Sequence, residues 1–275
     1  MRIAVIQLAY GDGEGVEQRT DRVAAMVREQ AGHDLVVLPE LWSAGGFDYP
    51  AWEERAQAVD GPVAQAMAAA ARDAGVTLHA GSIVERPADG QRGPEGKDLW
   101  NTSLVFDRGG DLVAAYRKIH RFGFGAGEPK LMEAGDRLAL VDVPDSAGGP
   151  AARAALSTCY DLRFPELYRA QVDAGATMFV IPAAWPMARV RHWTLLAHAR
   201  AIEDQCVVVA CNTAGTHAGH EMGGHSQVVL PTGDVLAVAG SGEQVLSVEV
   251  DMTVVDDYRE SFPVLRDRRL PFQRA

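Results

Sequence analysis

The feature of this sequence that most constrains its fold is a set of short apolar runs, each about as long as one strand. Residues 35–38 form one such run and residues 206–211 form another. A strand with one solvent-exposed face alternates apolar and polar residues, whereas an unbroken apolar run is typical of a strand that is covered on both faces. These runs therefore predict sheets that lie inside the molecule.

Helices alternate with strands along the whole sequence. Apolar residues at helical spacing predict helices at residues 16–30, 62–74, 164–174 and 189–204. Further strands are expected at residues 3–8, 76–84, 99–106, 112–116, 138–143, 154–156, 177–181, 228–230, 235–238 and 245–250. Both halves of the chain combine strands, helices and hairpins. We therefore expect an α/β fold of two stacked mixed sheets with helices outside.

Charge and hydropathy exclude several kinds of partner. The 275 residues carry a formal net charge of −11 without a basic stripe or tail, so we expect neither nucleic acid nor an anionic membrane as a partner. No apolar run is long enough to span a bilayer, and a strand pattern begins directly after Met1 in place of a signal peptide. A cytoplasmic protein is expected.

The three cysteines, Cys159, Cys206 and Cys211, have neither the spacing of a disulfide framework nor that of a metal site. This fits a reducing compartment and leaves Cys159 free to act as a thiolate. Cys206 and Cys211 lie in an apolar run, so we expect them to pack in the core. The expected organisation is a single domain over residues 1–275, with residues 260–275 as a C-terminal extension at a subunit interface.

Cys159 lies where an apolar strand meets a helix. The strand ends at Ser157, and Pro165 with Glu166 is typical of the first turn of a helix. A sharp turn between the two would expose the thiol and direct backbone N–H groups at a developing oxyanion. The local sequence equally fits a cysteine that is only a small buried side chain.

Glu40 and Lys118 also stand directly after apolar strands. A carboxylate, an ammonium group and a thiol can together carry out acyl transfer. The carboxylate accepts the thiol proton, the thiolate attacks a carbonyl carbon, and the ammonium stabilises the tetrahedral oxyanion. Taken alone, Glu40 also fits a surface carboxylate and Lys118 a solvated hairpin end. Spacing in sequence does not show whether Glu40, Lys118 and Cys159 converge.

These three residues belong to three longer motifs, which are Leu-Pro-Glu at 38–40, Tyr-Arg-Lys-Ile-His at 116–120 and Cys-Tyr-Asp-Leu-Arg-Phe-Pro-Glu at 159–166. Together and in this order they resemble the nitrilase superfamily of carbon–nitrogen hydrolases, nearly along the whole chain. The resemblance implies a four-layer αββα sandwich and a thioester mechanism. In that mechanism Glu40 is the general base, Lys118 stabilises the oxyanion and Cys159 is the nucleophile. It also implies a homodimer or higher homo-oligomer, and neither a metal nor a cofactor.

The same resemblance assigns supporting residues. Glu128 stands seven residues before Gly135, where the family often has a second glutamate that orients the lysine and the attacking water. Tyr160 follows the nucleophile, so its backbone N–H is expected in the oxyanion hole. Without the resemblance, Glu128 would be an ordinary loop carboxylate.

Two segments indicate the branch of the superfamily. Cys-Tyr-Asp at 159–161 is the form found in amidase branches, and Ala-Trp-Pro-Met-Ala-Arg at 184–189 resembles bacterial omega-amidases, which deamidate short ω-amides of dicarboxylic acids. Arg121 departs from the family, which commonly has Leu there, and this leaves the substrate open. The alternatives are an N-carbamoyl amino-acid hydrolase, a deaminated-glutathione amidase, a nitrilase, or a non-catalytic binding protein of the same fold.

A small amide substrate is expected to meet Tyr160, Trp185, Arg189 and Phe124. Trp185 follows a strand and should line the same mouth as the nucleophile. Arg189 begins a helix, where a cation is unfavourable unless its planar fork binds a substrate carboxylate. The alternative is an exposed arginine that reaches solvent or a partner subunit. Phe124 belongs to a glycine-rich loop, residues 122–128, which lacks the Lys-Ser/Thr pair of a phosphate loop and is expected to face the substrate.

Three histidines, His217, His220 and His225, lie on a second glycine-rich loop. Their spacing lacks both the cysteines and the i, i+4 helical pairing of a zinc site. No metal is expected there, and the role of this loop is left open.

Overall fold

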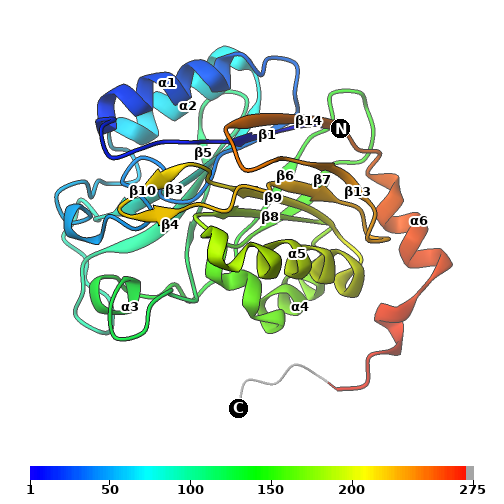
Figure 1. Ribbon diagram of the computed structural model, residues 1–275. Coiled ribbons are helices and arrows are strands. Elements are labelled where there is room, and N and C mark those ends of the chain that lie inside the picture. Colours follow the sequence, from blue (N-terminus) through cyan, green and yellow to red (C-terminus); the bar gives the residue numbers. More distant parts are fainter. Residues whose placement is uncertain (271–275) are drawn as a thin grey trace.

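The computed structural model describes residues 1–270 and contains two six-stranded mixed sheets that pack face to face (Figure 1). The first sheet has the order β14-β1-β2-β3-β4-β5. Its strands are β1 (Arg2–Gln7), β2 (Leu35–Val37), β3 (Thr77–Glu85), β4 (Trp100–Phe106), β5 (Leu112–Arg117) and β14 (Gln244–Glu249). The second sheet has the order β13-β12-β9-β8-β7-β6. Its strands are β6 (Leu140–Val143), β7 (Ala152–Leu156), β8 (Met178–Ala183), β9 (Val207–Asn212), β12 (Gln227–Val229) and β13 (Val235–Val238).

Parallel strands occupy the interior of both sheets. β1, β2 and β3 run parallel to one another, and so do β7, β8 and β9. The flanking pairs are antiparallel. Parallel neighbours end at the same edge of a sheet, and open α/β sheets bind ligands beyond the carboxyl ends of such strands. The residues that follow β2, β7 and β8 are therefore placed for a functional site.

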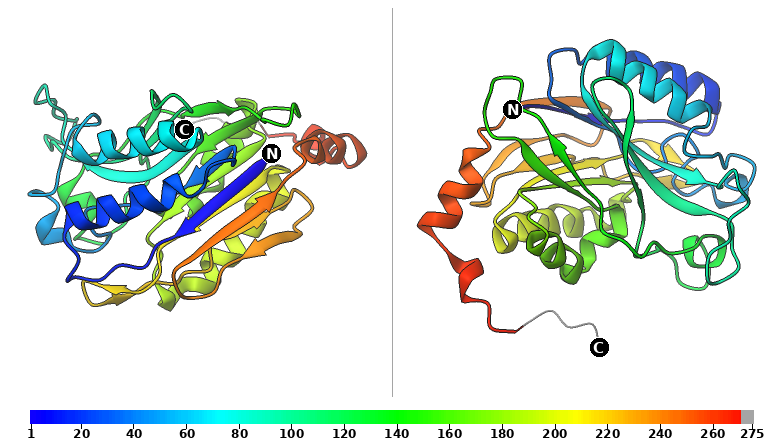
Figure 2. Two further views of the ribbon diagram at one scale, coloured as in Figure 1. Left: turned by 90° about the horizontal axis from the view of Figure 1, so that it is seen from above. Right: turned by 180° about the vertical axis from the view of Figure 1, so that it is seen from behind.

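Helices cover the outer face of each sheet (Figure 2). They are α1 (Val16–Arg28) and α2 (Pro62–Ala74) on the first sheet, and α4 (Pro165–Asp173) and α5 (Val190–Asp204) on the second. Apolar side chains fill the layer under α1 and α2, the layer between the sheets and the layer under α4 and α5, as Leu78, Val209 and Phe179 illustrate. Each such buried side chain stabilises the fold by about 1.5–3 kcal/mol. The predicted four-layer αββα sandwich is confirmed, and Cys206 and Cys211 are fully buried in it as predicted.

Several short elements were missed by the sequence patterns. They are α3 (Glu128–Leu131), β10 (Thr216–His217), β11 (His220–Glu221), α6 (Thr253–Ser261) and the 3-10 turns η1 (Tyr49–Ala51), η2 (Cys159–Arg163), η3 (Met187–Arg189) and η4 (Val264–Asp267). Apart from α6, each spans five residues or fewer, which is too short for a repeating apolar pattern to identify it. α6 is longer but buries only Val255, so it has no apolar stripe to detect.

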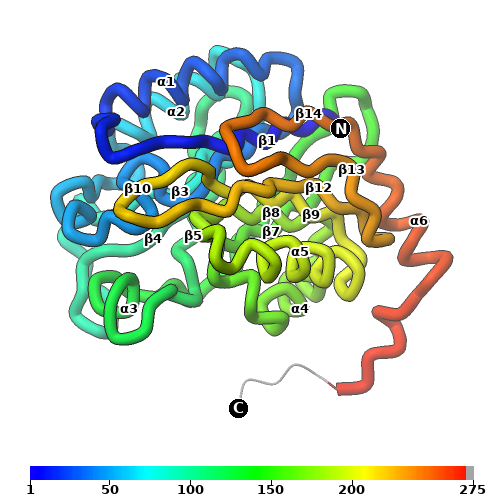
Figure 3. Tube along the Cα trace, in the orientation of Figure 1, coloured from blue at the N-terminus to red at the C-terminus, as the bar shows by residue number. Residues whose placement is uncertain are grey.

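The first and last strands of the described chain pair in the first sheet. β14 pairs antiparallel with β1, with Arg2 opposite Glu249. The Met1 ammonium group donates to the Val250 carbonyl at 2.8 Å. Figure 3 shows the orange tube of β14 beside the blue tube of β1. This pairing joins the N-terminal and C-terminal parts of the chain into one body.

α6 follows β14 and is tied to the second sheet. Arg259 Nη2 donates to the Ala176 carbonyl at 2.9 Å, and Gln205 Nε2 donates to the Phe262 carbonyl at 2.7 Å. Residues 271–275 of the expected C-terminal extension lie outside the described residues, and its place at a subunit interface stays a prediction. Between residues 1 and 270, no helix has both the length and the hydropathy needed to cross a membrane.

Candidate active site

Glu40, Lys118, Glu128 and Cys159 line one buried pocket. Lys118 Nζ lies 2.7 Å from Glu40 Oε1 and 2.8 Å from Glu128 Oε2, so one ammonium group bridges two carboxylates. The side chains of Lys118, Glu40 and Glu128 are at most 4% exposed. Charges buried this deeply persist only where they are paired and hydrogen-bonded. Glu40, Lys118 and Cys159, whose convergence could not be judged from their spacing in the sequence, thus lie together in one pocket.

Glu40 is held by groups from both sheets. It follows β2 of the first sheet, and the Ala184 N–H, which follows β8 of the second sheet, donates to Glu40 Oε2 at 2.9 Å. Asn101 Nδ2 donates to Glu40 Oε1 at 2.8 Å. The next residue, Leu41, has φ +44°, so the chain turns sharply away and leaves the carboxylate in the pocket. Both carboxylate oxygens therefore have a donor that fixes their orientation.

Asn101 is a site residue that the sequence patterns missed. Besides Glu40, it donates from Nδ2 to Glu128 Oε1 at 2.6 Å. It lies in β4, where every residue is buried. A side-chain amide in a wholly buried strand must find hydrogen-bond partners, and this was the signal that could have identified it. Asn101 sets the spacing between the two carboxylates.

Glu128 begins the single turn of α3, directly after Gly127, whose φ is +69°. The Phe122 N–H donates to Glu128 Oε2, and the Glu128 N–H donates to the Phe122 carbonyl at 3.1 Å. The glycine-rich loop thus closes on Glu128 through both its main chain and its side chain. Glu128 is 3% exposed and is not a surface carboxylate.

Cys159 is in a strained backbone conformation at the start of η2. Its φ is +48°, which costs a residue other than glycine about 1–3 kcal/mol and must be enforced by its surroundings. Thr158 and Asp161 form a capping box around it, with the Thr158 N–H donating to Asp161 Oδ2 at 2.9 Å. Asp161 also accepts from Tyr116 Oη at 2.7 Å and from the His120 N–H at 2.9 Å. The predicted sharp turn is confirmed, and Asp161 holds it in place. The expectation that the turn exposes the thiol is wrong, because Cys159 is only 8% exposed.

The electrostatics of the pocket favour a protonated thiol at rest. Burial, together with the nearby Glu40 carboxylate, raises the pKa of Cys159 well above its usual range. Burial lowers the pKa of Lys118, but the Glu128 and Glu40 carboxylates outweigh it and hold that pKa well above its usual value. Burial also raises the pKa of Glu128, against the opposing charge of Lys118. A nucleophilic Cys159 therefore needs a base that takes its proton during attack.

Aromatic side chains surround the mouth of the pocket. Phe47, Phe122, Tyr160 and Trp185 line it. The Phe122 ring centroid lies 5.4 Å from that of Tyr160 and 6.2 Å from that of Phe47. Phe124 was expected here but is 84% exposed and does not line the pocket. The glycines on either side of it have positive φ angles that turn it outward, and Phe122 takes its place in the wall.

Arg163 and Arg189 add positive charge to the same wall. The Arg189 guanidinium lies 5.5 Å from the Phe122 ring, and that of Arg163 lies 4.7 Å from the Trp185 ring. Within residues 1–270, neither guanidinium forms an ion pair with a carboxylate. The hydrogen bond of the Arg163 guanidinium there is with the His192 ring nitrogen, at 3.2 Å. Burial and the charge of Arg189 lower the pKa of Arg163. The wall can therefore accept an anionic group.

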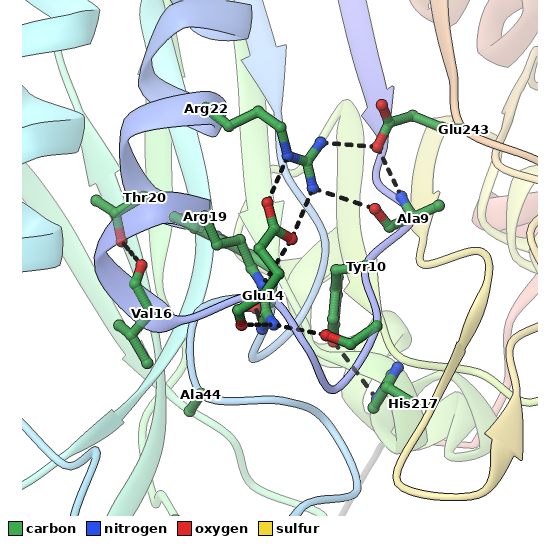
Figure 4. Close-up of polar contacts among 12 residues, drawn as sticks. Ala9, Tyr10, Glu14, Val16, Arg19, Thr20, Arg22, Ala44, His217 and Glu243 are labelled. Atoms are coloured by element: carbon green, nitrogen blue, oxygen red, sulfur yellow. Dashed lines mark hydrogen bonds and ion pairs between the residues drawn. The ribbon is translucent and has the colours of Figure 1, made fainter.

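The histidine loop lies behind Phe47. His217 stacks on Tyr10 with 4.5 Å between ring centroids, and the Arg19 guanidinium lies 4.1 Å from the Tyr10 ring (Figure 4). Burial and the charge of Arg19 lower the pKa of His217 to about 4, so this ring is neutral near pH 7. His220 packs on Phe47 at 4.5 Å. Across residues 1–270 no three His, Cys, Asp or Glu side chains are arranged to hold a metal ion. The β10–β11 hairpin instead backs the pocket wall.

Comparison with known sequences points to one family. The sequence model of the carbon-nitrogen hydrolases matches residues 2–260. A 2-oxoglutaramate amidase of Paenarthrobacter nicotinovorans is 44% identical over 268 residues, which cover 97% of this chain and 89% of that protein. A 2-oxoglutaramate amidase of Bacillus subtilis is 35% identical over 270 residues, which cover 97% of each.

A solved structure shows the same arrangement. A protein of the CN-hydrolase superfamily from Xanthomonas campestris, which carries an arsenic adduct in its active site, matches with a TM-score of 0.87 and 28% identity. The match covers 100% of this chain and 99% of that one. The similarity therefore includes both sheets and their helices.

Proposed function

This chain belongs to the carbon-nitrogen hydrolase family, and from that premise we propose that it is a cysteine-dependent omega-amidase. Its reaction would convert the terminal amide of a short dicarboxylic acid monoamide to a carboxylate and ammonia. The observation that carries this proposal is the Lys118 ammonium group between Glu40 and Glu128, in the pocket that also contains Cys159. The names of the two similar amidases support the substrate class.

In the first half-reaction, Glu40 accepts the thiol proton while the Cys159 sulfur attacks the amide carbon. Proton transfer accompanies attack, because burial and Glu40 keep the pKa of the thiol high beforehand. Lys118 Nζ and the Tyr160 N–H stabilise the oxyanion of the tetrahedral intermediate. Glu40 then gives its proton to the amide nitrogen, the C–N bond breaks, and ammonia leaves a thioester on Cys159.

In the second half-reaction, water attacks the thioester carbon. Glu40 takes a proton from the water, the C–S bond breaks, and Cys159 recovers its proton as the acid departs. Glu128, 2.8 Å from Lys118 Nζ, keeps the ammonium group aimed at the oxyanion and orients the water. The net change is one amide and one water converted to one carboxylate and one ammonium ion.

Arg163 and Arg189 are proposed to bind the distal carboxylate of the substrate. Both line the mouth beside Cys159, and within the described residues neither has a carboxylate partner. The sequence alone did not place Arg163 beside the substrate, because its approach to Arg189 depends on the fold. Two planar donors can hold a carboxylate at both oxygens.

The test is a panel of amides that differ only in the distal group. Succinamate should be cleaved about ten- to a hundredfold faster than butyramide in kcat/KM, since one charged contact contributes about 1.5–3 kcal/mol. Equal rates would contradict a carboxylate site.

Carbamoyl, nitrile and deaminated-glutathione substrates in the same panel separate the alternative hydrolases. Intact-mass detection of an acyl group on Cys159 tests the thioester, and no ammonia from any member would indicate a binding protein.

We also propose a cytoplasmic homodimer that forms through α4 and α5. Leu195 and Ile202 of α5 are 69% and 49% exposed, and a second copy would remove them from water. The net charge of −11 and the three free cysteines are consistent with the cytoplasm. Sedimentation equilibrium tests the assembly, since Leu195→Glu should convert a dimer to a monomer, and a wild-type monomer at micromolar concentration would contradict it.

A further inference from the structure

Residues 86–99, between β3 and β4, form a strap that lies against the segment carrying Glu128. The Lys97 N–H donates to Glu133 Oε1 at 2.9 Å, and Glu133 is only 2% exposed. A Cβ atom on Gly93 would lie 2.3 Å from Glu133 Cγ, so strap and segment touch without room for another side chain. The strap is therefore a packed neighbour of the catalytic segment.

Two cations converge on the end of α3. Lys97 Nζ donates to the Pro129 carbonyl at 2.6 Å and to the Met132 carbonyl at 3.3 Å. Arg121 Nη1 donates to the same Met132 carbonyl at 2.8 Å. α3 is a single turn, so its last carbonyls have no partner within the helix, and positive charge is favourable at that end. These contacts fix the end of the turn that Glu128 begins.

Glu95 joins the two cations. Glu95 Oε1 accepts from Arg121 Nη2 at 2.7 Å, and Glu95 Oε2 accepts from Lys97 Nζ at 2.5 Å. Arg121 Nη1 also lies 3.0 Å from Glu95 Oε2, which makes the arginine pairing bidentate. Arg121 adjoins Phe122, whose N–H donates to the Glu128 carboxylate. One surface carboxylate thus restrains both the loop before Glu128 and the turn after it.

We propose that Glu95 is a positioning residue for the reaction. Through Arg121 and Lys97 it holds Glu128 at the distance from Lys118 that catalysis requires. We name Glu95, Lys97 and Arg121 the latch. This inference rests on the proposed amidase function, in which Glu128 orients the lysine and the water. It also gives a structural role to Arg121, which stands where the family that the sequence resembles commonly has Leu.

The latch is sensitive to salt rather than to pH. The Glu95 side chain is 48% exposed, so its attraction to the two cations is screened by dissolved ions. Hydrogen bonds from Arg121 and Lys97 lower the pKa of Glu95 to about 2, so the carboxylate stays charged in any ordinary buffer. Glu128 is buried and is screened far less. Ionic strength can therefore change the rate through the latch while the catalytic carboxylates remain paired.

The test is Glu95→Gln in the full chain, which keeps the size of the side chain and removes its charge. We expect kcat for succinamate to fall about three- to tenfold with KM nearly unchanged, because Glu128 acts mainly on the transition state. Added NaCl, up to about 1 M, should lower wild-type kcat toward the value of the variant, whose own kcat should stay flat.

Glu243→Gln is the matched control. Glu243 is 39% exposed and pairs with Arg22 at 2.9 Å, and its other polar contact is with the Ala9 N–H (Figure 4). The Glu243→Gln variant loses the same charge at a residue that does not contact α3, so the kcat of this variant and its dependence on salt should match those of the wild type. Unchanged kcat in Glu95→Gln, or equal losses in both variants, would overturn the proposal.

A second variant shows whether the effect passes through Glu128. In a Glu128→Asp background, Glu95→Gln should cause no further loss of kcat, because both changes act on the same carboxylate. Full additivity would overturn the proposal. If the wild type releases no ammonia from any amide, the amidase function fails first. The latch is then tested by the rate of Cys159 alkylation with iodoacetamide, which must differ between Glu95→Gln and the wild type for the proposal to survive.

Discussion

The turn that carries Cys159 and the segment that carries Glu128 are held in place in different ways. The Cys159 turn is fixed first by its own sequence, since Asp161 and Thr158 close the capping box within three residues of each other. Glu128 has one nearby partner in Phe122 but depends also on residues from earlier parts of the chain, which are Asn101 and, through the latch, Glu95 and Lys97. The geometry of the nucleophile is therefore encoded mainly in its own turn, with Tyr116 and His120 as distant donors to Asp161. That of the auxiliary carboxylate depends more on residues elsewhere, which can change while the core stays intact.

The largest effect should come from the locally encoded region. Cys159→Ala should lower kcat by a factor of roughly 10⁴ or more, because no other group can form the thioester. The fold should remain, since Asp161 still holds the turn. Ammonia release and thermal unfolding, measured together, separate the two outcomes. Iodoacetamide labelling of Cys206 or Cys211 in a protein that stays active would show that the nucleophile is misassigned.

In the other region, Glu128→Gln should lower kcat by about a hundredfold and change KM less than threefold. The amide keeps the shape of the side chain but loses the charge that orients Lys118, a contribution of the size of general acid–base catalysis. Steady-state kinetics on succinamate is the measurement. A variant with wild-type kcat would mean that Glu128 only supports the loop. The Cys159 turn would then contribute to catalysis and the Glu128 segment would not.

The two regions meet at the proposed carboxylate site, since Arg163 belongs to the Cys159 turn and Arg189 lies beside Phe122 of the Glu128 loop. Arg189→Ala should lower kcat/KM for succinamate about ten- to a hundredfold and leave butyramide nearly unchanged. The ratio of the two rates is the readout. An unchanged preference for succinamate would place the carboxylate site on Arg163 alone.

The smallest effect on the rate is expected at Asp204, the last residue of α5. Burial raises its pKa from 3.8 to about 7, although Arg169 lies 3.2 Å away. A carboxyl whose folded pKa is raised binds its proton more tightly in the folded state, so stability falls as pH rises from about 4 to about 7. Asp204→Asn should remove this loss and add roughly 1–3 kcal/mol to the free energy of unfolding at pH 8, with kcat unchanged. Denaturant titration at pH 5 and pH 8 provides the check, because equal destabilisation at both would mean that the Arg169 pair outweighs the burial cost.

The same contrast explains what the sequence could predict. The apolar run at residues 35–38 and the Cys159 turn are local patterns, and both were found where expected. Asn101 and Arg163 were not assigned to the site, because their roles depend on side chains brought close by the order of strands in two different sheets. Phe124 was named where Phe122 proved to line the pocket. Both phenylalanines adjoin glycines of the loop, and their directions depend on the backbone φ angles of those glycines, which a sequence does not display.

Because β1 pairs with β14, the first strand of the described chain cannot complete its pairing until the last strand has been synthesised. Arg2 lies opposite Glu249, so β1 has an unpaired edge on the nascent chain until residues 244–249 have left the ribosome. A long-range pairing of this kind slows folding, and an apolar edge strand left open in the meantime is prone to aggregate. The protein is therefore expected to need more help from chaperones during synthesis than a chain whose terminal strands pair with sequence neighbours.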